Sequence, residues 1–142
     1  MQLPPSLPFD AEVAGAFLAS LRRRYEGAVA CEPRHASWFT PEVSKRLIGV
    51  GVARVAADPP VVPQAAEPGA WGGLVYYRLH GSPKVYDSAY PAEYLEALAV
   101  TLRETAHAAP TWCIFDNTAQ GAATPNALAV AGRLDELGDD PG

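Results

Sequence analysis

Basic residues are scarce in this 142-residue chain, and only Arg22, Arg23 and Arg24 form a run of like charge. Proteins that bind nucleic acid normally present clustered Lys and Arg side chains, whereas the net charge here is −5. At helical spacing, the three arginines are typical of the solvated end of a helix. The composition therefore argues against a nucleic-acid partner.

Long apolar runs and paired cysteines are missing as well. No segment reaches the ~20 apolar residues that a membrane-spanning helix needs. The N-terminal residues show neither the charged nor the apolar region of a leader peptide. Cys31 and Cys113 lie in separate apolar runs, which indicates free buried thiols and a reducing compartment. We therefore expect a soluble, cytoplasmic protein with no membrane partner.

The residues that are present suit a globular domain, with 49% hydrophobic and 19% charged side chains. We expect residues 1–137 to form that domain and residues 138–142 to form a frayed tail. Helices are predicted over residues 10–25, from Thr40 onward, over 90–106 and over 124–137. Strands are predicted over residues 28–32, 52–57, 74–80 and 112–117.

Caps and turn residues support these boundaries. Asp10 is a predicted N-cap, and Thr40-Pro41 and Thr124-Pro125 each combine a capping side chain with a proline at the first helical position. The prolines and glycines of residues 59–73 predict an irregular surface loop, and Met1-Gln2-Leu3 resembles the end of one more strand. Short apolar strands that alternate with helices predict an α/β fold of four to five parallel strands covered by helices.

Each predicted strand is apolar until its C-terminal end and then becomes polar. The polar groups are Glu32, Arg34 and His35 after the first strand, Asp58 after the second, Arg78 and His80 in the third, and Asp116 and Asn117 at the fourth. Ligands bind at the carboxyl ends of the strands in parallel α/β sheets. The strand ends therefore predict a binding site at one edge of the sheet.

Side-chain alternation predicts how the third strand is oriented. Tyr77 and Leu79 share one face, which suits a helix layer, whereas Arg78 and His80 share the other. The polar pair is therefore expected to point inward, toward one common site.

The same reasoning is applied to the second and fourth strands. Arg54 and Asp58 alternate with apolar neighbours, so this charged pair is expected to face inward. The fourth strand is ambiguous, because either Asp116 or Asn117 could face inward, and Asn117 is favoured.

The motifs at these strand ends resemble the YecE-like family, also called domain of unknown function 72. They are Gln2-Leu3-Pro4-Pro5, Glu32-Pro33-Arg34-His35-Ala36-Ser37-Trp38, Tyr77-Arg78-Leu79-His80-Gly81, Phe115-Asp116-Asn117-Thr118 and Asn126-Ala127. The resemblance covers about residues 1–137 and matches only the C-terminal half of the family's domain. It implies a partial TIM-barrel-like fold with a polar pocket at the C-terminal strand ends. It implies no particular activity, because none is established for the family.

A candidate site follows from these residues. Glu32 and His80 are the candidate catalytic residues, with Glu32 as a general acid or base. The candidate ligand-binding residues are Arg34, His35, Arg78, Asn117, Asp58 and Asn126. Arginine suits phosphate or carboxylate ligands because its guanidinium group presents a fork of hydrogen-bond donors.

Structural roles compete with these functional ones. Glu32 and Arg34 could form an ion pair at a strand end, and His35 could serve a local hydrogen bond. Asp58 could simply end its strand, and Trp38 is expected to plug a loop at the rim.

Three hypotheses for function follow. The first is a pocket for a small anionic or phosphate-bearing ligand, with hydrolysis as a further step. The second is a metal-assisted phosphodiesterase or nuclease, with Glu32, His35, His80 and Asp116 as conceivable ligands, although no HxH or HExxH spacing supports it. The third is a truncated, non-catalytic unit whose open sheet edges need a partner chain, for example in a homo-oligomer. The sequence identifies no cofactor and leaves open whether the chain is an enzyme.

Overall fold

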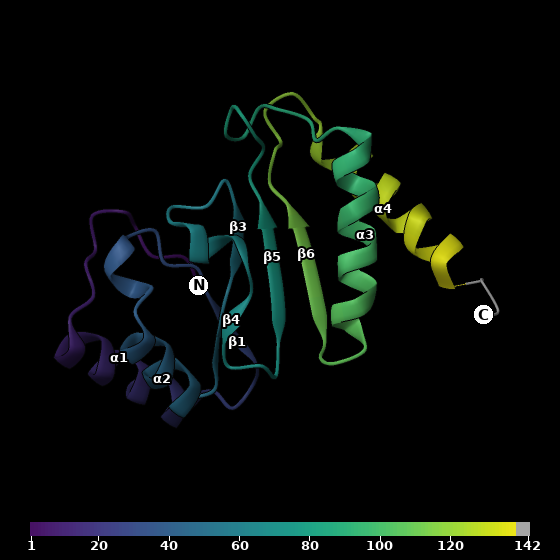
Figure 1. Cartoon of the computed structure of the whole chain (residues 1–142). Coiled ribbons are helices and arrows are strands. Elements are labelled where there is room, and N and C mark those ends of the chain that lie inside the picture. Colours follow the sequence, from purple (N-terminus) through teal and green to yellow (C-terminus); the bar gives the residue numbers. More distant parts are fainter. Residues whose placement is uncertain (139–142) are drawn as a thin grey trace.

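Four helices flank two short sheets in the computed structural model, which describes residues 1–138 (Figure 1). The helices are α1 (Ala11–Arg24), α2 (Pro41–Gly49), α3 (Ala92–Ala106) and α4 (Ala123–Gly138). The strands are β1 (Val29–Cys31), β2 (Val52–Arg54), β3 (Ala56–Asp58), β4 (Gly69–Ala70), β5 (Val75–Leu79) and β6 (Thr111–Phe115), with 3-10 turns at Ala36–Trp38 and Pro63–Ala66. The predicted α/β fold is confirmed. None of the described helices is long and apolar enough to cross a membrane.

The sheets are mostly parallel, with strand orders β1-β2-β4 and β3-β5-β6. β1 pairs with β2 in parallel, and β5 pairs in parallel with both β3 and β6. Parallel neighbours need long crossovers, and α2 and α3 provide two of them. The backbone of Gln2 adds a parallel bridge to Glu32, so the expected strand end at Met1-Gln2-Leu3 is present.

The segment from Val52 to Asp58 passes from one sheet to the other. The sequence predicted one strand over residues 52–57, but the segment divides at Val55, whose N–H donates to the Cys31 carbonyl at 2.9 Å. The prediction of an irregular loop over residues 59–73 was also incomplete, because β4 lies within it and pairs antiparallel with β2. A two-residue strand is too short to show side-chain alternation.

Two of the three predicted helix caps are confirmed. Asp10 accepts hydrogen bonds from the N–H groups of Glu12 and Val13, both at 2.9 Å, and Thr40 accepts from Val43 N–H at 3.2 Å. The third prediction was wrong, because α4 begins at Ala123 and Thr124 is inside it. Of the predicted tail, Gly138 is the last residue of α4, and residues 139–142 lie outside the described residues.

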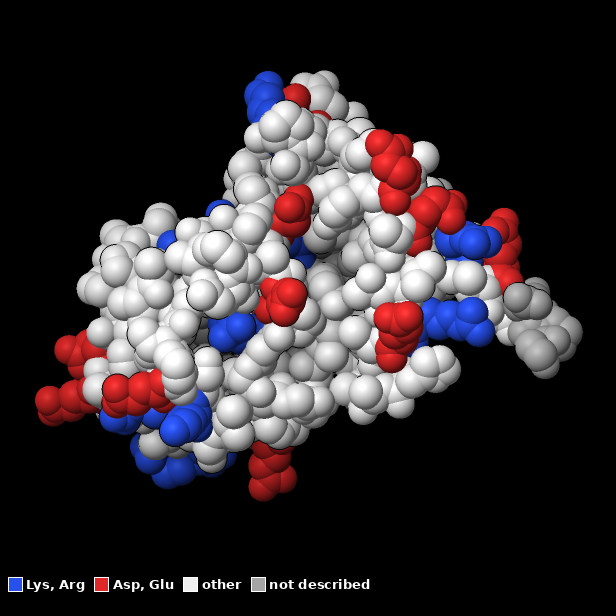
Figure 2. All heavy atoms as spheres, in the orientation of Figure 1, with Lys and Arg blue, Asp and Glu red and all other residues white. Residues whose placement is uncertain are grey.

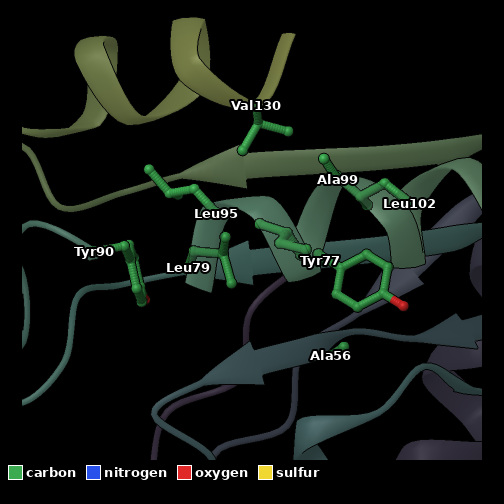
Figure 3. Close-up of a cluster of buried hydrophobic side chains, with 9 residues drawn as sticks. Ala56, Tyr77, Leu79, Tyr90, Leu95, Ala99, Leu102 and Val130 are labelled. Carbon is green, nitrogen blue, oxygen red and sulfur yellow. The ribbon is translucent and has the colours of Figure 1, made fainter. Parts of the chain in front are cut away.

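Two apolar cores hold the helices against the sheets. In the larger one, α3 and α4 pack on β3, β5 and β6 through Tyr77, Leu79, Leu95 and Val130, among others (Figure 3). In the other, α1 and α2 pack on β1 and β2. Cys31 lies in the core beneath α1 and α2, and Tyr77 lies in the core beneath α3 and α4. We call the side of the sheets that these helices cover the covered face.

The apolar face of α1 is narrow. Leu18 is buried, together with Ala14, but Val13 and Phe17 are more than half exposed. Ala14 and Leu18 are four residues apart and form one narrow stripe, which joins the apolar core on β1 and β2. In α2, Val43 and Leu47 are buried, whereas Ile48 is exposed.

The opposite side of the sheets, which we call the open face, carries a groove of about 520 Å³. Ala30, Val55, Tyr76 and Ile114 form part of its lining. Its polar end is formed by Gln2, Glu32 and Arg78, and large apolar side chains such as Trp112 stand at its rim.

Candidate functional site

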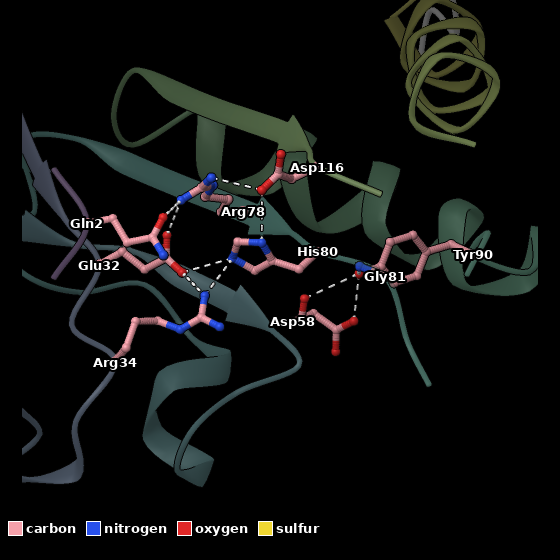
Figure 4. Close-up of polar contacts among 9 residues, drawn as sticks. All are labelled: Gln2, Glu32, Arg34, Asp58, Arg78, His80, Gly81, Tyr90 and Asp116. Carbon is pink, nitrogen blue, oxygen red and sulfur yellow. Dashed lines mark hydrogen bonds and ion pairs between the residues drawn. The ribbon is translucent and has the colours of Figure 1, made fainter. Parts of the chain in front are cut away.

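Five side chains meet at the carboxyl ends of β1, β5 and β6: Glu32, Arg34, Arg78, His80 and Asp116 (Figure 4). We call this set the ion cluster. Because β1, β5 and β6 run in parallel within their sheets, their carboxyl ends bring residues distant in sequence together. The structure thus joins Glu32, Arg78 and His80, as the alternation pattern predicted.

Glu32 is the centre of the ion cluster. Its Oε1 accepts from Arg34 Nη1 at 2.7 Å and lies 2.9 Å from His80 Nε2. Its Oε2 accepts from Arg78 Nη1 at 2.8 Å. The Glu32 side chain is 3% exposed, so a buried carboxylate is surrounded by three hydrogen-bond donors.

The charge of Glu32 is set by two opposing effects. Burial alone would raise its pKa, since it penalises the charged form, but the hydrogen bonds from His80, Arg78 and Arg34 outweigh burial and lower the pKa to about 2. Glu32 is therefore a carboxylate at neutral pH, and all three donors contact it in that form.

His80 connects this buried carboxylate to a second one nearer the surface. Its Nδ1 lies 3.1 Å from Asp116 Oδ2, and its Nε2 faces Glu32 Oε1. Nε2 also lies 3.1 Å from Arg34 Nη1. The ring is therefore held between two carboxylates and one guanidinium.

Arg78 binds the same two carboxylates, Glu32 and Asp116, from the open face. It donates from Nη2 to Asp116 Oδ2 at 2.8 Å and from Nη1 to both Glu32 and the side-chain oxygen of Gln2. Burial lowers the pKa of its guanidinium, but Glu32 and Asp116 more than offset this and raise it. Arg78 is thus fixed in orientation by three acceptors.

Asp116 was missed as the inward residue of its strand, and the expectation for Asn117 was wrong. Asp116 follows Trp112 and Ile114 on alternate positions, and these two line the groove on the open face. Asn117 points to the covered face, where its Nδ2 donates to the Ser88 carbonyl and to Asn126 Oδ1, each at 2.9 Å. Each candidate follows an apolar residue on its own face, Ile114 before Asp116 and Phe115 before Asn117, so alternation alone could not distinguish them.

Asn117 and Asn126 belong to a second polar network that holds the loop after β5. Asn126 Oδ1 also accepts from Tyr90 N–H at 3.1 Å. The Tyr90 hydroxyl donates to Asp58 Oδ2 at 2.7 Å and accepts from Gly81 N–H at 2.8 Å. Asp58 therefore lies with Tyr90 rather than with Glu32 (Figure 4).

The charged residues of the second predicted strand face the helices, contrary to expectation. Arg54 packs over the ring of Phe39 at 5.2 Å and donates to Ser44 Oγ at 3.3 Å and to the Gln64 carbonyl at 3.2 Å. The predicted alternation of side chains along the segment is correct, but Arg54 and Asp58 face the helices and Val55 faces the groove, which is the reverse of the expected orientation. The sequence alone did not indicate that Phe39, Ser44 and Gln64 would lie beside Arg54.

His35 also lies apart from the ion cluster. Its Nδ1 accepts from Ser37 N–H at 3.2 Å and caps the turn Ala36–Trp38. Trp38 is buried and donates from Nε1 to the Leu7 carbonyl at 3.0 Å. Both residues therefore stabilise the loop after β1.

Metal ligation has no support from the geometry of residues 1–138. No group of three or more His, Cys, Asp or Glu side chains in this part of the chain is arranged to hold a metal ion. Of the four conceivable ligands, His35 is turned away, and the other three bind Arg34, Arg78 or one another.

Charges of both signs are interspersed on the face shown in Figure 2, with no extended basic patch there. Lys and Arg side chains gather at the lower left of this view, beside acidic side chains. This pattern agrees with the low content of basic residues in the sequence.

Comparisons with known proteins place the chain in a family. The family described as "Protein of unknown function DUF72" matches residues 1–141. The chain belongs to the DUF72 family. No curated protein matches the chain.

Solved DUF72 structures share its fold. A DUF72 family protein from Thermotoga maritima is 28% identical, with a TM-score of 0.75, over 94% of this chain and 56% of that one. Two structures of a DUF72 family protein from Enterococcus faecalis are 21% and 22% identical, with TM-scores of 0.75 and 0.74. They cover 94% of this chain and 57% and 59% of those chains. This DUF72 chain therefore spans a little over half the length of the structures it matches.

Proposed function

We propose that the ion cluster of this DUF72 protein binds a small anionic ligand that carries a phosphate or carboxylate group. The observation that carries the proposal is the geometry of Arg34. Glu32 holds its Nη1, and within residues 1–138 its Nε and Nη2 make no hydrogen bond. The side chain is 18% exposed, so this edge is within reach of solvent.

The free edge of Arg34 suits an oxyanion. Two parallel N–H groups on a planar guanidinium match two oxygens of a carboxylate or phosphate group. The Glu32 contact fixes this edge in orientation before a ligand arrives, which lowers the entropy that binding costs. Arg78 adds positive charge from β5, and its side chain is 26% exposed.

The candidate catalytic roles are divided differently from the sequence-based hypothesis. Glu32 is too buried and too firmly ionised to donate a proton at neutral pH, so we assign it to positioning Arg34 and Arg78. Asp116 is the accessible carboxylate, with a side chain 29% exposed. If the ligand is hydrolysed, Asp116 would act as the base, with His80 behind it to accept or return a proton.

The remaining candidates receive structural roles in this proposal. His35 caps a turn, and Asp58, Asn117 and Asn126 hold the loop that follows β5. We further propose that the two sheets are part of a TIM-barrel-like arrangement, because polar groups gather at the carboxyl ends of parallel strands as they do in such barrels.

Thermal melting with inorganic phosphate tests the ligand site. At matched ionic strength, a phosphate concentration a hundredfold above its dissociation constant should stabilise the fold by ~2.7 kcal/mol. The Arg34→Lys variant keeps the positive charge but loses the two-donor edge, so it should lose most of this stabilisation.

Arg46 provides the matched control, because it lies on the exposed face of α2 and, within residues 1–138, pairs only with Glu42. Arg46→Lys should respond to phosphate like the wild type. No stabilisation of the wild type, or equal stabilisation in Arg34→Lys, would contradict the anion site. Citrate in place of phosphate would show whether carboxylates bind there too.

A further inference from the structure

The open face of the sheets is unusually apolar at both of its edges. Trp112, on β6 at one edge, is 59% exposed, and Met1 and Tyr25, at the other, are 41% and 50% exposed. All three line the same groove. Large apolar side chains gathered around one hollow mark a surface that another polypeptide covers.

Backbone groups at these edges are also unpaired. In the described part of the chain, residues 1–138, β6 pairs only with β5, and the Met1–Leu3 segment pairs only with the Glu32 region. An unpaired strand edge is a template for another strand. Within residues 1–138 these two edges do not pair with each other.

We propose that a second copy of this chain covers the open face, related by a two-fold axis that runs along the strands. This rotation places β6 of each copy beside the Met1–Leu3 segment of the other. It makes β6 of each copy run parallel to the Met1–Leu3 segment of the other, as β5 and β6 already run within one copy. Trp112 of each copy then packs against Met1 and Tyr25 of the other, so the apolar rims cover one another at both junctions.

Charge favours this occupant as well. The open face carries Glu32, Arg78 and Asp116, which are paired within their own copy. Two such faces meet without uncompensated like charges, whose juxtaposition would oppose association. This inference concerns the assembly and does not depend on the ligand proposed for the ion cluster.

Sedimentation velocity of the purified chain across about a hundredfold range of concentration tests the dimer. The wild type should sediment as a dimer, whereas Trp112→Glu and Tyr25→Arg should each sediment as monomers. Leu128→Glu is the matched control, because Leu128 is 67% exposed on α4, away from the groove. It should remain dimeric.

Mixing Trp112→Glu with Tyr25→Arg tests the two-fold arrangement itself. In the mixed dimer, the introduced Glu at position 112 of one copy would face the introduced Arg at position 25 of the other. The second contact would keep the native Trp112 and Tyr25. The mixture should therefore regain the dimer. Near-UV circular dichroism shows that each variant is folded. A monomeric wild type, dimers that survive Trp112→Glu, or a folded mixture that stays monomeric would each overturn the proposal.

Discussion

Glu32 Oε1 and His80 Nε2 lie 2.9 Å apart, and both side chains are withdrawn from solvent. Replacing Glu32 with Gln keeps the size of the side chain but removes the negative charge that Arg34, Arg78 and His80 share. Breaking a buried ion pair from one side typically costs ~3 kcal/mol or more. We expect Glu32→Gln to lower the free energy of unfolding by about 3 kcal/mol, measured by urea denaturation.

Glu42→Gln provides the control for this substitution. Glu42 pairs with Arg46 at 3.2 Å on the surface of α2, with a side chain 75% exposed. Such exposed pairs contribute ~0.5 kcal/mol or less. Equal effects of the two substitutions would show that the buried cluster contributes no more to stability than a surface pair.

Acid should weaken the fold through Glu32. The pKa of Glu32 falls from the ordinary 4.5 to about 2 on folding, so its stabilisation is complete above pH 4.5 and is lost as the pH falls toward 2. The shift corresponds to about 3 kcal/mol. The difference in unfolding free energy between wild type and Glu32→Gln should therefore shrink as the pH falls through this window. A difference that is constant with pH would contradict the depressed pKa.

Gly81 should resist substitution, whereas Gly132 should accept it. Gly81 has φ +94°, and a Cβ there would lie 2.9 Å from the Ser88 carbonyl oxygen and 3.1 Å from Asn117 Cβ. We expect Gly81→Ala to cost about 2 kcal/mol, from the strained backbone and the close contacts. Gly132 lies inside α4 with open space around it, so Gly132→Ala should stabilise the protein by up to ~1 kcal/mol. Thermal melts of the two variants should therefore shift in opposite directions.

Neither cysteine should react in the folded protein. Burial raises the pKa of Cys31 and of Cys113 to about 12, and the thiolate is the reactive form. Iodoacetamide at neutral pH should label no thiol in native protein and both in urea, which mass spectrometry can count. Rapid labelling of Cys113 alone in the native state would show that the end of the molecule around β6 and α4 opens locally.

The sequence predicted those parts of the site where polar and apolar residues contrast within one strand. In β5, Tyr77 and Leu79 on one face and Arg78 and His80 on the other left little ambiguity, and the structure agrees. In β6 both faces are apolar, so the choice between Asp116 and Asn117 had no basis, and it was wrong.

Other errors came from partners that are distant in sequence. Arg54 faces the helices because Phe39, Ser44 and the Gln64 carbonyl receive it there. Gly69 leaves space for it, since a Cβ at that position would lie 2.4 Å from Arg54 Nη2. The expectation that charged side chains face away from the helices fails when other segments supply partners for them on the covered face. The pattern of a single strand cannot reveal such partners.

The long-range character of the ion cluster has a consequence for the order of folding. The Glu32–Arg78, Glu32–His80 and Arg78–Asp116 contacts join residues 46, 48 and 38 positions apart. Each contact requires a long loop to close first, and the entropy lost in closing it is recovered only after the strands have paired. The cluster should therefore assemble late, after the local helices and the β5–β6 pairing. A folding intermediate of this protein would then have much of its secondary structure but an ordinary, titratable glutamate at position 32.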